Sequence, residues 1–448
     1  MLTHEWMTGR ASRLTWIAWG IFFVAACLAL ALPKERRQAS AAYARGAARW
    51  QDGLDLYDEG GKGFIYLPPS AVLYVPFSML PRYPQDVLWR LVTIGLFAAG
   101  VYRFSKMAAE GTGFEYFPLV SLLVLPKTWT CAINGQATPA LAGLSMLAMV
   151  AIHEQKWGRA AFFLAAALAF KPLAIVLILL VGVLFAPMRS RLALGIAVFI
   201  ALPYLTQSRG YVTEQYRASV GMLQDAADIG RELRWAHLFS LGKLIGLELA
   251  PVWETILRIL AAVATLALSW LVARTRESEP RQGVPDSPPL RQGGAGGVSL
   301  GEELQNENCK LQKANMPGSS SKSEIRNPKS EIAPWPLIEI YALATSYLLL
   351  FNPRTENNSY LMLSPVIAVF CARAWVVEHR AAKACWLCAA AVAIFGGHDF
   401  CNLVTPQSEV VWVCPLVSLA FVGVVIHDVM TQESLTQRRK DAKLNAEA

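Results

Sequence analysis

The sequence predicts an all-α, polytopic integral membrane protein with ten to twelve transmembrane helices, and three observations support this fold class. Hydrophobic residues form 54% of the 448 residues and charged residues only 17%, and the mean hydropathy of +0.36 departs from the soluble average. Apolar runs recur that are long enough to cross a hydrocarbon core of about 30 Å, which takes about 20 residues. Basic residues cluster at the ends of these runs, as is typical of cytoplasmic loops.

The apolar runs are spread along most of the chain. The first is longer than the apolar core of a typical signal peptide, so we expect it to be a retained helix. The region 159–187 is apolar over a longer stretch than a single helix needs. Apart from 159–187, the runs lie near residues 13–32, 86–102, 116–133, 136–152, 191–206, 252–273, 336–352, 360–377, 382–396 and 409–427.

The basic clusters predict which segments lie in the cytoplasm. The net charge of +8 therefore orients the chain in a bacterial-type inner membrane, and we expect no nucleic-acid partner. The predicted cytoplasmic segments are both termini, 103–115, 153–159, 188–191, 274–334 and 378–383. The predicted outer segments are 33–63, 207–236, 353–359 and 397–408.

Two segments do not behave as simple spans. The run 159–187 lies between two cytoplasmic segments, so it has to leave and return, turning at Lys171-Pro172 as two short helices. Segment 64–81 contains four prolines, which remove helix donors and are tolerated at membrane depth only where protein or water satisfies the backbone. The alternation of loops favours re-entry of this segment from the outer face over a full span.

A change of composition divides the membrane body. Residues 275–334 are rich in Gly, Pro, Ser and Asn, and such a segment cannot form a core. We therefore expect a disordered cytoplasmic linker there. It separates an N-terminal membrane region, 1–274, from C-terminal membrane helices, 335–430, which a cytoplasmic tail, 431–448, follows.

Polar side chains interrupt the most apolar part of the chain. Asn134 and Gln136 flank a glycine between two runs, and Lys171 lies in the middle of the run 159–187. Amides and an unpaired lysine at membrane depth cost several kcal/mol unless they face protein or water. These residues therefore predict a polar cavity with a function.

The first outer loop, 33–63, carries the groups that a sugar-phosphate site needs. It combines carboxylates, guanidinium groups and aromatic rings, which can deprotonate a hydroxyl and bind phosphate. Tyr43, Ala47 and Trp50 recur at helical spacing, which predicts a helix on the membrane surface. The polar groups of this loop include Glu35, Arg36, Arg37, Asp52, Asp55 and Tyr57.

In this order, the features resemble glycosyltransferase family 87, whose members are multi-spanning GT-C enzymes related to polyprenyl-phosphate-mannose-dependent mannosyltransferases. The resemblance rests on the Gly-x-Asp-Leu-Tyr that ends at Tyr57, on the Phe-x-Tyr-x-Pro-Pro around Tyr66, on Asn134-Gly135-Gln136 and on Lys171-Pro172. It runs from the first span to about residue 206 and resumes at 351–360.

The resemblance implies roles for individual residues. Asp55 would be the catalytic base, Lys171 and Arg354 would hold the donor phosphate together with Arg36 or Arg37, and Asn134 and Gln136 would donate hydrogen bonds to it. Substrate-binding positions also fall on Tyr57, Tyr66, Glu356 and Asn357.

The chain departs from the family at two positions. The family's catalytic aspartate would fall near Gln38, Ala39 or Ser40, where no carboxylate stands, and its later outer loop commonly has a histidine where this chain has Asn357 or Asn358. Either another carboxylate is the base, with Asp55, Glu35 and Asp52 the nearest choices, or the chemistry has changed.

The implied reaction moves a hexose, with mannose the first candidate, from a polyprenyl-phosphate sugar to a lipid or glycan acceptor on the outer face. Its partners are the lipid-linked donor, the acceptor and the membrane lipids. We expect no cofactor and no metal ion, since no Asp-x-Asp pair is present. Two other classes stay open: a transporter or flippase, which also uses polar groups at broken helices, and a non-catalytic relative, which the missing aspartate favours.

Overall fold

The computed structural model describes residues 9–31, 39–58, 63–229, 235–275, 332–405 and 411–447. All the regular elements of this part are helices and none is a strand, which confirms the predicted all-α class. The predicted linker lies almost entirely outside the described residues. The helices are α1 (Gly9–Leu28), α2 (Ala39–Asp52), α3 (Pro68–Ser78), α4 (Arg82–Ala108), α5 (Phe117–Ile133), α6 (Thr138–His153), α7 (Trp157–Phe170), α8 (Ile175–Leu184), α9 (Met188–Ala201), α10 (Arg209–Ile229), α11 (Leu238–Leu244), α12 (Pro251–Thr275), α14 (Pro334–Phe351), α15 (Ser364–Val376), α16 (Ala381–Phe395), α17 (Gly397–Val404) and α18 (Val413–Glu447), with 3-10 turns η2 (Ala29–Ala31), η4 (Pro172–Ala174), η5 (Leu202–Leu205) and η6 (Asn357–Met362).

The number of full-length spans is lower than the ten to twelve expected. By length and composition, seven of the described helices could cross a membrane, or eight if the pair α16 and α17, bent by 83°, counts as one span. Each predicted run is a helix, but the four from α5 to α8 are shorter apolar helices of 10–17 residues. The polar turns at Asn134 to Gln136 and at Lys171-Pro172 end these helices early.

The two segments that were not expected to be simple spans form short helices. The run 159–187 forms α7 and α8, and Lys171 joins them in an extended conformation, with φ −150° and ψ 137°. Helix α3 has 11 residues and rises about 16 Å, so it is too short to cross a core of about 30 Å. Its first residues, Pro68 and Pro69, are buried.

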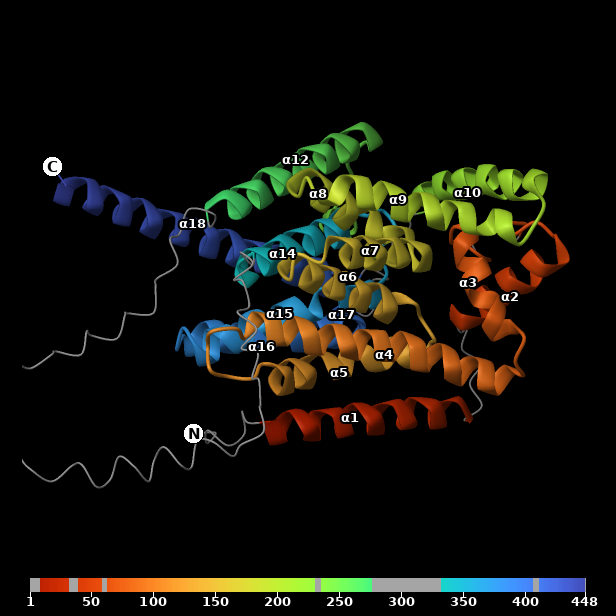
Figure 1. Cartoon of the computed structure of the whole chain (residues 1–448), viewed down its shortest axis with the longest axis horizontal. Helices are drawn as coiled ribbons and strands as arrows, with labels where there is room; N and C mark the ends of the chain where they lie inside the picture. Colours follow the sequence, from red (N-terminus) through yellow and green to blue (C-terminus); the bar gives the residue numbers. More distant parts are fainter. Residues whose placement is uncertain are drawn as a thin grey trace, which may run out of the picture. The chain divides into compact units, whose positions relative to one another are not determined.

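The helices form one bundle, and α2, α3 and α10 lie together beyond one end of it (Figure 1). On α2, the predicted face of Tyr43, Ala47 and Trp50 is buried. Segments predicted to be cytoplasmic meet at the other end of α4: Arg103 pairs with Glu154, and His153 Nδ1 lies 2.6 Å from the carbonyl oxygen of Ile332. These contacts bring three of the segments that are predicted to be cytoplasmic together at one end of the bundle.

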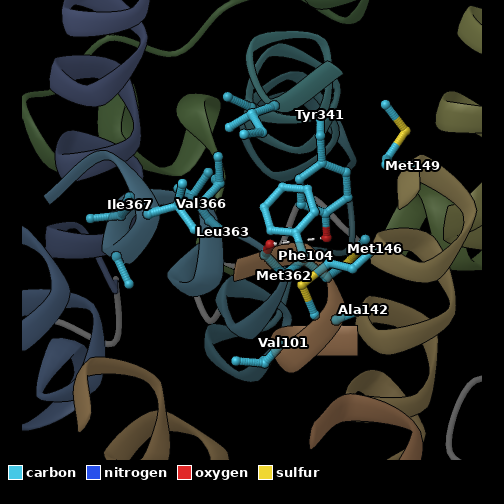
Figure 2. Close-up of a cluster of buried hydrophobic side chains, with 14 of the residues drawn as sticks. Val101, Phe104, Ala142, Met146, Met149, Tyr341, Met362, Leu363, Val366 and Ile367 are labelled. Carbon is cyan, nitrogen blue, oxygen red and sulfur yellow. Dashed lines mark hydrogen bonds between the residues drawn. The ribbon is translucent and has the colours of Figure 1, made fainter. Parts of the chain in front are cut away.

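The core of the bundle lies between α4, α6, α14 and η6. Figure 2 shows Phe104 and Met146 beside Tyr341, whose hydroxyl donates a hydrogen bond to the carbonyl oxygen of Met362 at 3.3 Å. The rings of Phe104 and Tyr341 are 5.4 Å apart. This core holds the helices that carry the polar turns.

Helices α4 and α6 approach each other through glycines. A Cβ on Gly100 would lie 2.7 Å from the Cα of Gly143, and a Cβ on Gly143 would overlap the carbonyl oxygen of Leu96. Both obstacles are backbone atoms, which cannot rotate away. Small residues permit such close packing between membrane helices.

We expect Gly143→Ala to lower the stability of the bundle by about 1–3 kcal/mol, the usual cost of overpacking. Thermal unfolding in detergent measures this effect. Gly95→Ala on α4 is the matched control, because a Cβ there meets nothing within 4 Å. Equal unfolding temperatures for the two variants would contradict the close approach.

Candidate active site

The described residues form a pocket of about 390 Å³ where the loop before α3, the α7–α8 turn and the loop after α14 meet. One side of it is apolar, with Leu173, Ile175 and Val176 from η4 and α8. Four predicted site residues line the pocket, and they come from regions far apart in the sequence: Tyr66, Lys171, Arg354 and Glu356.

A chain of hydrogen bonds connects the cation of this pocket to its carboxylate. Lys171 Nζ donates to Thr138 Oγ1 at 2.9 Å, the Thr138 hydroxyl donates to Gln136 Oε1 at 3.2 Å, and Gln136 Nε2 donates to Glu356 Oε2 at 3.4 Å. In each bond an ammonium, hydroxyl or amide N–H group donates and an oxygen accepts. The predicted residues Lys171, Gln136 and Glu356 thus form one polar unit, and Thr138 is a member that the sequence analysis missed.

Lys171 is held as a buried cation. Its side chain is 7% exposed, and none of the ion pairs within the described ranges includes it. Extended backbone between α7 and η4 positions it, and its N–H donates to the carbonyl oxygen of Ala167 at 3.0 Å. A buried ammonium group with no carboxylate partner is costly and suits the binding of an anion.

Arg354 adds a second cation to the pocket. Its guanidinium carbon lies 5.2 Å from the ring centre of Trp235, which is the distance of a cation–π contact. Glu356 lines the same pocket, where its Oε2 accepts from Gln136.

The turn at Asn134 to Gln136 is fixed by its backbone. Gly135 has φ +61°, and a Cβ there would lie 2.9 Å from Ser40 Oγ. The Asn134 carbonyl oxygen accepts from Ala39 N–H at 2.9 Å, and the Gly135 carbonyl oxygen accepts from Trp89 Nε1 at 2.9 Å. These bonds place Gln136 beside Glu356. Asn134 therefore contributes to this turn through its backbone carbonyl group.

Two further polar residues support this turn, and the sequence analysis did not select either. Arg90 is fully buried and donates to the carbonyl oxygens of Ala132 at 2.8 Å and Ile133 at 3.0 Å. It also pairs with Asp86 at 3.3 Å, which accepts from the Ser40 hydroxyl at 2.8 Å. An arginine within the apolar run 86–102 was the available sequence signal.

Tyrosines form the wall between α2 and the pocket. Tyr43 stacks on Tyr66, with ring centres 4.3 Å apart, and its hydroxyl donates to the carbonyl oxygen of Phe170 at 3.1 Å. The Tyr57 hydroxyl donates to the carbonyl oxygen of Tyr66 at 2.7 Å. Burial raises the pKa of Tyr57 far above its usual value. This phenol therefore stays neutral and can donate its hydrogen bond to the backbone of Tyr66.

Two of the three predicted bases, Asp52 and Asp55, lie outside the pocket. Asp52 and Asp55 are exposed at the end of α2 and do not line the pocket. Asp55 accepts from the N–H of Tyr57 at 3.1 Å, as a turn-capping carboxylate does. Glu35, Arg36 and Arg37 lie outside the described residues.

Asn357 follows Glu356, and two hydrogen bonds hold its side chain. Its Oδ1 accepts from Lys127 Nζ at 2.9 Å and from the Cys414 thiol at 3.2 Å. Lys127 is 1% exposed and was also missed, although it is a lysine inside the apolar run 116–133. Its bond to Asn357 fixes the start of η6 and therefore the backbone beside Glu356.

A comparison with known families matches part of this chain. The sequence profile of glycosyltransferase family 87 matches residues 64–284. This part of the chain is therefore similar to the membrane glycosyltransferases of family 87. No curated protein matches the chain.

The matched region contains Tyr66, Asn134, Gln136 and Lys171. Asp55 and Glu356 lie outside it. Within the described ranges, no group of three His, Cys, Asp or Glu residues could hold a metal ion. The side chains that the pocket offers to a ligand are therefore two cations, one carboxylate and aromatic and aliphatic groups.

Proposed function

We propose that this protein transfers a hexose, with mannose the first candidate, from a polyprenyl-phosphate sugar to a lipid or glycan acceptor. The reaction would take place on the outer side of a bacterial-type inner membrane. The observation that carries the proposal is the pocket itself, in which Lys171 and Arg354 lie next to an apolar wall. A phosphate attached to a hydrocarbon chain has the same division into a charged and an apolar part.

The apolar wall continues along α8. Ile175, Leu179 and Val183 are 42%, 62% and 52% exposed and recur at i, i+4 and i+8, so they share one helix face. This face starts at the pocket and leads away from Lys171. A polyprenyl chain along it would bring its phosphate to the lysine.

An assay of the purified protein in lipid vesicles tests the proposal. We expect transfer to an acceptor from polyprenyl-phosphate mannose and none from the water-soluble nucleotide sugar. We also expect activity to persist in excess chelator, because cations of the protein replace a metal ion at the phosphate. Complete loss of activity in chelator would contradict the metal-independent reaction.

The same vesicles separate the proposal from the two other classes. A labelled polyprenyl-phosphate sugar that crosses the vesicle membrane without any transfer would identify a flippase. Binding of the donor with neither transfer nor transport would identify a non-catalytic relative. Use of the nucleotide sugar alone would exclude the lipid-linked donor.

A further inference from the structure

We infer that Glu356 is the general base of the transfer reaction, an inference that rests on the proposed function. Among the described residues that line the pocket, Glu356 is the one carboxylate. A general base has to reach the proton that it removes, within about 2.6–3.2 Å or through one water. The position of Glu356 in the pocket wall satisfies this condition for an acceptor bound there.

The hydrogen bonds of Glu356 leave one of its oxygens open. Oε2 accepts from Gln136, whereas no hydrogen bond or ion pair within the described ranges involves Oε1. The bond to Gln136 fixes the orientation of the carboxylate, and the connection through Thr138 to Lys171 couples this orientation to the cation. One oxygen is thereby positioned by the protein while the other can accept a proton.

The backbone beside Glu356 is held on both sides. The Thr355 carbonyl oxygen accepts from Ala236 N–H at 2.8 Å, and the Tyr360 hydroxyl donates to the carbonyl oxygen of Ala236 at 2.8 Å. On the other side, Lys127 binds Asn357. A carboxylate fixed in this way is preorganised for its reaction.

The competing carboxylates are less suited to the role. Asp55 is exposed outside the pocket and accepts from Tyr57 N–H. Asp86 is already neutralised, since it pairs with the fully buried Arg90 and accepts from Ser40. Neither has the free, pocket-facing position that Glu356 has.

The step balances in atoms and charge. The Glu356 carboxylate takes the proton of the acceptor hydroxyl as the acceptor oxygen forms a bond to the anomeric carbon of the sugar. The bond from that carbon to the phosphate oxygen breaks, and its electron pair stays on the polyprenyl phosphate, whose charge Lys171 and Arg354 stabilise. The products are the glycosylated acceptor, the polyprenyl phosphate and a protonated Glu356.

Turnover and donor binding of Glu356→Gln test the assignment. The amide keeps an oxygen that can accept from Gln136 but cannot remove a proton, so we expect kcat to fall by about 10²–10⁴-fold while donor affinity changes less than about threefold. Asp399→Asn is the matched control, because its side chain is 93% exposed in another predicted outer loop, and it should retain wild-type turnover.

Chemical rescue separates a base from a residue that only positions the substrate. We expect added formate to restore part of the turnover of Glu356→Ala, since formate can occupy the space of the carboxylate and accept the proton. Unchanged kcat in Glu356→Gln, a loss confined to Asp55→Asn, or a Glu356→Ala variant that formate does not restore would overturn the inference alone. A wild type that transfers no sugar from polyprenyl-phosphate donors would overturn the proposed function as well.

Discussion

Lys171→Met is expected to lower sugar transfer by at least about 100-fold without unfolding the protein. The lysine is the buried cation of the pocket, and loss of one group that stabilises the developing charge of a leaving group typically costs 10²–10³-fold in rate. Methionine has a similar length and removes a buried charge, so the bundle loses no packing. The measurement is kcat/KM with the polyprenyl-phosphate sugar, together with the unfolding temperature in detergent.

Two further variants show which property of Lys171 matters. Lys171→Arg keeps the charge and should retain more activity than Lys171→Met. Thr138→Val removes the hydrogen-bond partner of Lys171 but leaves both charges in place, and it should reduce kcat/KM by about tenfold, as expected for the loss of about one net hydrogen bond. Wild-type kcat/KM in Lys171→Met would remove the lysine from the donor site.

The sequence alone predicted much of the fold and part of this site. Each apolar run is a helix, since hydrophobic length is a strong signal for membrane helices. Tyr66, Lys171, Arg354 and Glu356 line one pocket, because polar groups inside apolar sequence have to face protein or a cavity.

Other features depended on distances that a sequence does not contain. Ser40 stands near the position of the missing family aspartate, at the start of α2. Its hydroxyl donates to Asp86, which is 46 positions away in the sequence. Only the packing of the helices shows that a carboxylate lies beside this position. Whether a carboxylate of the first outer loop reaches the pocket depends on the turn after α2, and this turn leaves Asp55 exposed. The number of full-length spans depended on where polar turns end the helices from α5 to α8.

Arg90→Met is expected to destabilise the protein by about 3–5 kcal/mol, the typical cost of removing one partner of a buried ion pair. The substitution leaves Asp86 without its cation and removes the donors to the carbonyl oxygens of Ala132 and Ile133. Because these carbonyls lead directly into the turn that carries Gln136, transfer should fall together with the unfolding temperature.

A double-mutant cycle resolves the two causes of this loss. Asp86→Asn removes the uncompensated charge, so Arg90→Met combined with Asp86→Asn should be more stable than Arg90→Met alone if the ion pair dominates. If the bonds to the carbonyl oxygens dominate, the second substitution restores nothing, because Ala132 and Ile133 still lack a donor. We expect partial recovery of stability with little recovery of transfer, since the turn that holds Gln136 beside Glu356 depends on the arginine itself.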